Sequence, residues 1–74
     1  MKKIIEVTGM HCSHCEQAVE DAIFALDGVT KVKADHEKNR VVVKMKTEVD
    51  DRLLVEAIEI EGFVPGEIKT GLFG

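Results

Sequence analysis

The sequence is poor in aromatic residues, proline and cysteine. Its 74 residues include three phenylalanines, no tryptophan or tyrosine, one proline and two cysteines. Two cysteines in one C-x-x-C are too few for the disulfide framework of a small secreted protein. The chain also lacks an apolar run long enough for a membrane span or the core of a signal peptide. We therefore expect a cytoplasmic protein without direct membrane insertion, whose cysteines serve a local chemical purpose.

The residues that are present are ordinary for a small globular protein, with 45% hydrophobic and 32% charged residues. A chain of this length forms one domain, which we place over residues 1–74, with a core at about 3–69 and a loose tail at 71–74. The net charge of −4 is unevenly distributed, because residues 13–27 carry −4, residues 47–62 carry −5 and the rest carry +5. Segregated charge usually marks solvated faces, but it can also steer a partner.

The hydrophobic pattern predicts two helices and four strands. Alternating apolar residues indicate strands, and apolar residues at spacings of three and four indicate helices. The predicted strands are residues 3–8, 30–35, 40–46 and 63–70, and the helices run from 13 to about 26 and from about 50 to 61. The last strand contains Pro65, which is typical of an edge or bulged strand. The order βαββαβ predicts an α+β, ferredoxin-like fold, in which two helices cover one face of a four-stranded antiparallel sheet.

The expected helix ends have recognisable capping residues. Ser13 and Glu16 match the capping-box pattern, which predicts Ser13 as the N-cap of the first helix. Gly28 suits the left-handed conformation that follows a helix. Either Thr47 or Asp50 would cap the second helix.

The segment GMHCSHC, residues 9–15, concentrates the side chains that can bind metal. Cys12 precedes the predicted helix and Cys15 lies in its first turn, where free amides and the helix dipole favour thiolate over thiol. Thiolates are soft ligands for Cu(I), zinc or an iron–sulfur cluster. A closed zinc or cluster site normally uses four protein ligands, and the chain has no other cysteine. Two thiolates therefore favour Cu(I), with Zn(II) as the alternative.

Three histidines are the remaining nitrogen donors. His14 should point away from the helical stripe that contains Cys15, so we expect both His11 and His14 to be exposed and not to bind metal. The alternative is that one of them completes a zinc site or a copper-bridged dimer. His36 falls in the predicted hairpin at 36–39, far from the cysteines, and is expected at the surface.

The string Gly9-Met10-x-Cys12-x-x-Cys15, following a first strand in a βαββαβ chain, resembles the heavy-metal-associated domain, in particular the small CopZ-type copper chaperones of bacteria. The resemblance extends over about residues 3–69. It includes Ala18-Val19, Ala22-Ile23, Leu26, Gly28-Val29, Ala57-Ile58 and Gly62-Phe63. It implies that Cys12 and Cys15 bind the metal, that Met10 turns into the core, and that Phe63 lies near the metal as an apolar shield.

The same resemblance implies a metal carrier rather than an enzyme, monomeric without metal. Such a chaperone transfers Cu(I) by thiolate exchange to the metal-binding domain of a copper-transporting P-type ATPase or to a copper-responsive regulator. The family also includes domains that bind zinc, mercury or cadmium, and N-terminal domains of the ATPases themselves. We expect the acidic residues of the helices to meet basic residues of the partner; the candidates are Glu16, Glu20, Asp21, Glu59 and Glu61.

Two unrelated classes share single features with this sequence. Thiol–disulfide redox proteins also place C-x-x-C at a helix start, but the thioredoxin-like fold has a different strand order. The RNA-recognition motif shares the βαββαβ order, but it stacks bases on aromatic residues of its inner strands, and residues 40–46 contain none. We therefore expect no nucleic-acid partner.

Overall fold

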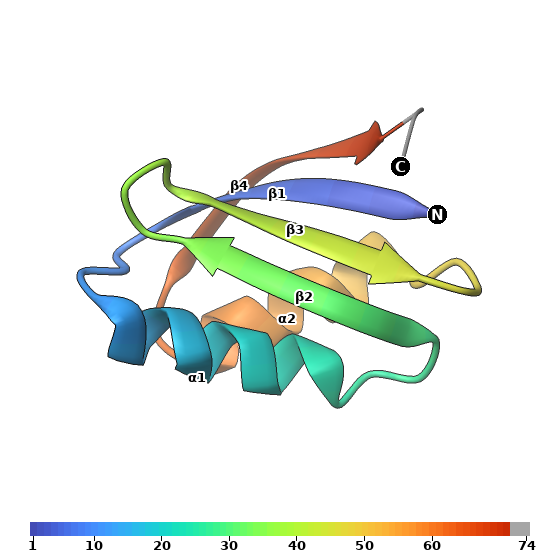
Figure 1. Ribbon diagram of the computed structural model, residues 1–74, viewed down its shortest axis with the longest axis horizontal. Helices are drawn as coiled ribbons and strands as arrows, with labels where there is room; N and C mark the ends of the chain where they lie inside the picture. The colour runs from blue at the N-terminus through green and yellow to red at the C-terminus, as the bar shows by residue number, and fades with distance from the viewer. Residues whose placement is uncertain (72–74) are drawn as a thin grey trace.

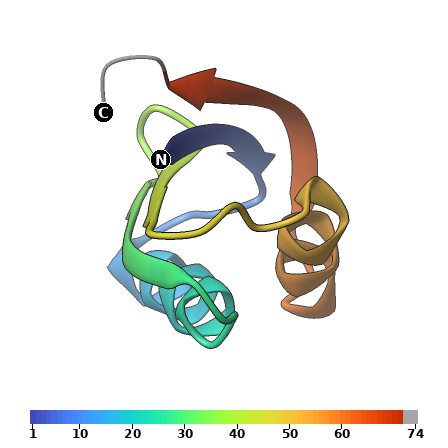
Figure 2. The same cartoon turned by 90° about the vertical axis from the view of Figure 1, so that its right-hand side faces the viewer.

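The chain folds in the predicted order βαββαβ (Figure 1). In a computed structural model that describes residues 1–71, the elements are β1 (Lys2–Thr8), α1 (Ser13–Phe24), β2 (Val29–Asp35), β3 (Arg40–Met45), α2 (Asp51–Ile60) and β4 (Val64–Gly71). The strands form one antiparallel sheet in the order β2-β3-β1-β4. Both helices lie on the same face of this sheet (Figure 2), which confirms the ferredoxin-like prediction.

The hydrophobic core lies between the sheet and the two helices. Strand alternation decides which residues enter it: Ile5 and Val7 are fully buried, while Glu6 between them is exposed. Burying one such aliphatic side chain contributes about 1.5–3 kcal/mol. The core hydrophobic residues are Ile5, Val7, Met10, Val19, Ile23, Ala34, Val41, Val43, Met45, Val49, Leu54, Ala57 and Ile58. Both helices therefore pack through the stripes that their sequences predict.

The start and the end of α1 differ from the prediction. Cys12, not Ser13, occupies the N-cap position of α1. The capping-box prediction is wrong because the Glu16 carboxylate bonds to the turn between β2 and β3 instead of returning to the helix start. At the other end α1 stops at Phe24, before Leu26, which packs on the core from the following turn.

The remaining boundaries agree more closely with the pattern. Asp50 caps α2, because its Oδ1 accepts a hydrogen bond of 2.9 Å from the amide of Arg52. Gly28 has φ +94°, the left-handed conformation predicted for it, in the turn before β2. β4, with Pro65, is an edge strand with a register shift in its pairing to β1. Gly71 belongs to β4 rather than to a tail, and residues 72–74 lie outside the described part of the chain.

The two inner strands, β1 and β3, contain no aromatic residue, so they do not match the stacking surface of an RNA-recognition motif.

Within residues 1–71, neither helix has the length and apolar character that crossing a membrane requires.

Candidate metal centre

The loop that joins β1 to α1 lies at one end of the sheet, on the left in Figure 1. Gly9 opens it with φ +105°, and a Cβ at this position would lie 3.3 Å from Cδ1 of Phe63, so glycine permits both the turn and the close contact. Met10 is only 5% exposed and belongs to the core. The predicted burial of Met10 in the core is therefore confirmed, and Phe63 packs beside Gly9, while its role as a shield of the metal stays a prediction.

Cys12 is exposed and stands directly before the first residue of α1. Hydrogen bonds from the backbone amides of Cys15 and His14 hold the pKa of the Cys12 thiol below its usual value of 9.0. Burial and the nearby Glu16 carboxylate act in the opposite direction, but less strongly than these amides together. The direction of this shift agrees with the prediction that the helix start favours the thiolate of Cys12.

Cys15 lies one helical turn further on and differs from Cys12 in its surroundings. Its side chain is partly buried and packs against the hydrophobic core. The Cys15 thiol also hydrogen-bonds the Cys12 sulfur, which further lowers the pKa of Cys12. The fold therefore brings the two predicted ligands together, with one sulfur facing solvent and the other anchored.

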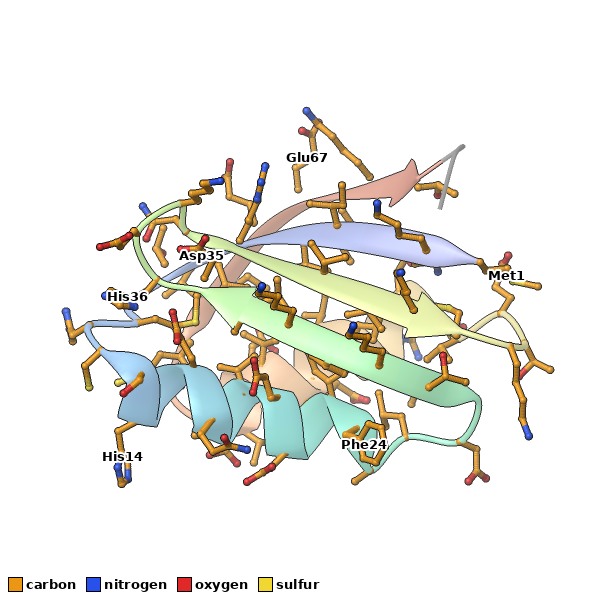
Figure 3. The ribbon with its side chains drawn as sticks, viewed as in Figure 1. Met1, His14, Phe24, Asp35, His36 and Glu67 are labelled. Carbon is orange, nitrogen blue, oxygen red and sulfur yellow. The ribbon has the colours of Figure 1, made fainter. Side chains whose placement is uncertain are left out.

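His11 and His14 are both exposed, as predicted. Figure 3 shows the His14 side chain directed away from the sheet, from the outer side of α1. Within residues 1–71, no three side chains of the His, Cys, Asp and Glu types are placed to hold one metal ion together. Cys12 and Cys15 stay the predicted metal ligands.

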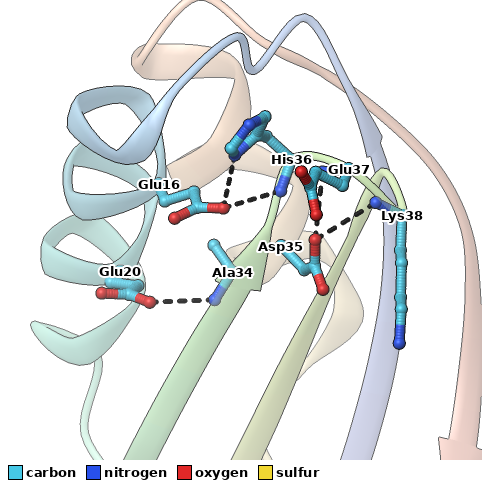
Figure 4. Close-up of polar contacts among 7 residues, drawn as sticks. All are labelled: Glu16, Glu20, Ala34, Asp35, His36, Glu37 and Lys38. Carbon is cyan, nitrogen blue, oxygen red and sulfur yellow. Dashed lines mark hydrogen bonds and ion pairs between the residues drawn. The ribbon is translucent and has the colours of Figure 1, made fainter.

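The prediction for His36 is wrong in one respect: this residue is not simply a surface residue of a distant hairpin. Its amide donates to Oε2 of Glu16 at 2.8 Å, and its ring Nδ1 lies 2.7 Å from the same oxygen (Figure 4). Since an ionised carboxylate only accepts hydrogen bonds, the ring donates through Nδ1–H. These bonds from the amide and the ring of His36 lower the pKa of Glu16 below its usual value of 4.5. Sequence reasoning missed this pair because the spacing of Ser13 and Glu16 suggested a local cap.

A second carboxylate of α1 makes the same kind of contact one turn further along. Oε2 of Glu20 accepts a hydrogen bond of 2.9 Å from the amide of Ala34 (Figure 4). Ala34 and His36 lie along the outer edge of the sheet, because β2 is an edge strand. Glu16 and Glu20 therefore make hydrogen bonds within the fold, and their part in docking to a partner stays a prediction. Glu59 and Glu61 are exposed.

Comparison with known proteins agrees with this architecture. The sequence profile of the heavy-metal-associated domain matches residues 4–63. The copper chaperone CopZ of Staphylococcus haemolyticus is 42% identical over 64 residues, which cover 85% of this chain and 94% of that protein. CopZ of Enterococcus hirae is 40% identical over 60 residues, which cover 81% of this chain and 80% of that protein. The chain belongs to the heavy-metal-associated domain family.

Solved structures show the same fold in two kinds of protein. A CopZ metallochaperone superposes with a TM-score of 0.84 at 34% identity, covering 89% of this chain and all of that one (100%). A copper binding domain from HMA7, a P-type ATPase, superposes with a TM-score of 0.79 at 32% identity. The match covers 99% of this chain and 100% of that domain. Within the family, the chain is thus similar both to copper chaperones and to a copper binding domain of a P-type ATPase.

Proposed function

We propose that this protein is a copper chaperone, a single domain over residues 1–74 that holds one Cu(I) ion between the sulfurs of Cys12 and Cys15. The observation that supports this most directly is the pairing of the two thiols at the start of α1, one exposed and one packed on the core. Two soft donors suit Cu(I), which accepts a low coordination number, better than Zn(II), which normally takes four ligands. The similarity to proteins named copper chaperones supports the same metal.

In this proposal transfer proceeds by ligand exchange, and the difference in exposure between Cys12 and Cys15 supports different roles for the two sulfurs. A thiolate of the partner reaches the copper ion from the exposed side and adds as a third ligand. Cys12 then leaves first, because its sulfur faces solvent and regains the hydrogen bonds from the amides of His14 and Cys15. Cys15, packed against the core, releases the ion last. The copper ion changes ligands without changing its oxidation state, so the protein acts as a carrier and not as an enzyme.

The recipient that we propose is the metal-binding domain of a copper-transporting P-type ATPase, with a copper-responsive regulator as the second possibility. Two solved ATPase or transporter domains share this fold at 32% and 35% identity, which supports an exchange between similar sites. Such an exchange takes place in the cytoplasm. A redox role for the same C-x-x-C is disfavoured by the fold, because the antiparallel order β2-β3-β1-β4 is not that of a thioredoxin.

Anaerobic titration with Cu(I) and Zn(II) against competing chelators tests the assignment. We expect one Cu(I) per chain and a clear preference over Zn(II). X-ray absorption of the copper-loaded monomer should show two sulfurs and no nitrogen in the first shell. Tighter binding of Zn(II) than of Cu(I), or nitrogen ligands in the monomer, would contradict the proposal. Nitrogen ligands that occur only in a dimer would indicate copper bridging through a histidine.

A further inference from the structure

The open face of the sheet, opposite the helices, carries a group of lysines. Because Ile5, Val41 and Val43 enter the core, the side chains that alternate with them point to this open face. The register places Lys31 opposite Lys44 and Lys44 opposite Lys2, so three lysines form one row across β2, β3 and β1. The next row contains Lys33, Val42, Ile4 and Lys69. We name the five residues Lys2, Lys31, Lys33, Lys44 and Lys69 the lysine face.

This arrangement opposes the stability of the sheet. Like charges directly opposite each other on neighbouring strands are destabilising, and the first row contains two such pairs in succession. Among residues 1–71 the lysine face has one ion pair, between Lys69 and Glu67 at 3.7 Å, and both of these side chains are largely exposed. Glu6 and Glu67 lie beside Ile4 and Lys69 at one end of this open face, but among residues 1–71 the row of Lys2, Lys44 and Lys31 has no ion pair.

We infer that the lysine face is a docking surface for an anionic lipid bilayer. The face is the uncovered side of a sheet, and its centre holds the aliphatic, half-buried side chains of Ile4 and Val42 between the lysines. Lysines around a small apolar centre suit the negatively charged headgroup region of a membrane. Single-stranded nucleic acid fits less well, because its sequence-independent binding uses aromatic platforms, and β1 to β4 contain no aromatic residue.

The acidic helices do not prevent this association. They cover the opposite face of the sheet (Figure 2), and the molecule is 18 Å across even along its shortest axis. At physiological ionic strength the Debye length is about 8 Å, so a bilayer in contact with the lysine face is screened from the acidic side chains behind it. The net charge of −4 is therefore the sum of an acidic side, formed by the helices, and a basic side, formed by the open face of the sheet.

Docking in this way leaves the metal centre accessible. The row of Lys2, Lys44 and Lys31 lies at the end of the sheet where β1 begins, and the Cys12–Cys15 loop follows the end of β1 (Figure 1). The loop then lies at the side of the docked molecule and faces along the membrane. The inference itself rests only on charge and strand register and does not depend on the proposed copper function.

Cosedimentation of the apo-protein with large vesicles tests the inference. We expect binding to vesicles that contain phosphatidylserine, loss of this binding in high salt, and none with phosphatidylcholine alone. In K31Q/K44Q, binding should fall by about 25-fold, since each lysine at an anionic surface contributes about fivefold. The same variant should be as stable as the wild type or more stable, because a like-charge pair is removed.

The matched control is R52E, which changes the net charge by the same amount but at an exposed residue of α2, on the helical side of the sheet. Its vesicle binding should stay within about twofold of wild type, the range of ordinary surface substitutions. The inference is wrong if the wild type does not sediment with phosphatidylserine vesicles at physiological salt, or if the control loses as much binding as K31Q/K44Q. Binding of an oligo-dT strand without vesicle binding would also overturn it, in favour of nucleic acid.

Discussion

Glu16 and His36 are 20 positions apart in the sequence, yet one carboxylate oxygen of Glu16 receives both the backbone amide and the ring Nδ1–H of His36. Glu16 directly follows Cys15, so this contact ties the first turn of α1, next to the candidate metal centre, to the turn between β2 and β3 (Figure 4). Within residues 1–71 it is the polar side-chain contact that joins this first turn to another element. The position of Cys15 thus depends on a residue far along the chain.

The Glu16–His36 contact should make stability depend on pH in acid. The pKa of Glu16 is lower in the folded protein than its usual value of 4.5, so its contribution is fully present above that value and is lost as pH falls through the folded pKa. Urea unfolding of Glu16→Gln should therefore show a shallower loss of stability below about pH 4.5 than wild type. Glu67→Gln, which alters an exposed carboxylate of β4, serves as the control and should follow the wild-type curve. Equal slopes for all three proteins would contradict the prediction.

Cys12 should react with iodoacetamide at lower pH than an ordinary thiol. The Cys15→Ser variant isolates Cys12 and keeps the amides of residues 14 and 15 that donate to its sulfur. Because these amides stabilise the thiolate, the midpoint of the pH–rate profile should lie below 9.0. An unfolded peptide with the sequence of residues 9–18 and serine at position 15 gives the reference. A midpoint no lower than that of the peptide would show that the helix start does not activate Cys12.

The histidines beside the cysteines should contribute little to Cu(I) affinity. His11→Ala and His14→Ala remove exposed rings, and we expect affinities within about twofold of wild type. Cys12→Ser and Cys15→Ser each remove a soft ligand. Changes to residues around a metal ligand typically lower metal affinity by up to about 100-fold, so we expect each of these two variants to lose more Cu(I) affinity than that. Competition with a chelator specific for Cu(I) measures all four variants. A large loss in His14→Ala would mean that this histidine binds the metal.

The protein should keep its fold without metal. The core consists of aliphatic and methionine side chains between the sheet and the helices, and Cys15 only packs against its edge. An NMR spectrum of the apo-protein should therefore be as well dispersed as that of the copper form, with shifts confined to residues 9–15 and to Phe63 beside Gly9. Leu54→Ala, at a fully buried site of α2, should instead cost about 2–5 kcal/mol. A poorly dispersed apo spectrum would show that metal binding is coupled to folding.

Docking to a basic partner should depend on Glu59 and Glu61 rather than on Glu16 and Glu20. Glu59 and Glu61 are exposed near the C-terminal end of α2, which leads to the Phe63 contact with the metal loop, whereas Glu16 and Glu20 bond to the β2 edge. Reversing Glu59 and Glu61 to Lys should slow copper transfer to a partner domain, leave Cu(I) affinity nearly unchanged and reduce the effect of salt on the rate. Stopped-flow transfer at several salt concentrations measures this. Rates that respond to neither salt nor charge reversal would assign these carboxylates to a solvated surface.

Local pattern was sufficient for much of the fold. Alternation in β1 and β3 and the stripe of Leu54, Ala57 and Ile58 in α2 correctly predicted which residues are buried, because burial on one face imposes a period of two or 3.6 on the sequence. Asp50 could be recognised as a cap because its bond reaches only two residues along the chain. The pair Cys12 and Cys15 was visible for the same reason, since both ligands lie within one turn of a predicted helix start.

Only the tertiary structure decided the contacts between elements that are distant in sequence. The pattern of Ser13 and Glu16 is compatible with a local cap, but the amide and ring of His36 offer Glu16 two hydrogen bonds that the helix start cannot, and Cys12 takes the N-cap position instead. The lysine face likewise requires the register, because Lys2, Lys31 and Lys44 are scattered in the sequence and form a row only when β1, β2 and β3 pair. Sequence determines which faces are buried; the pairing of strands and helices determines which charges meet.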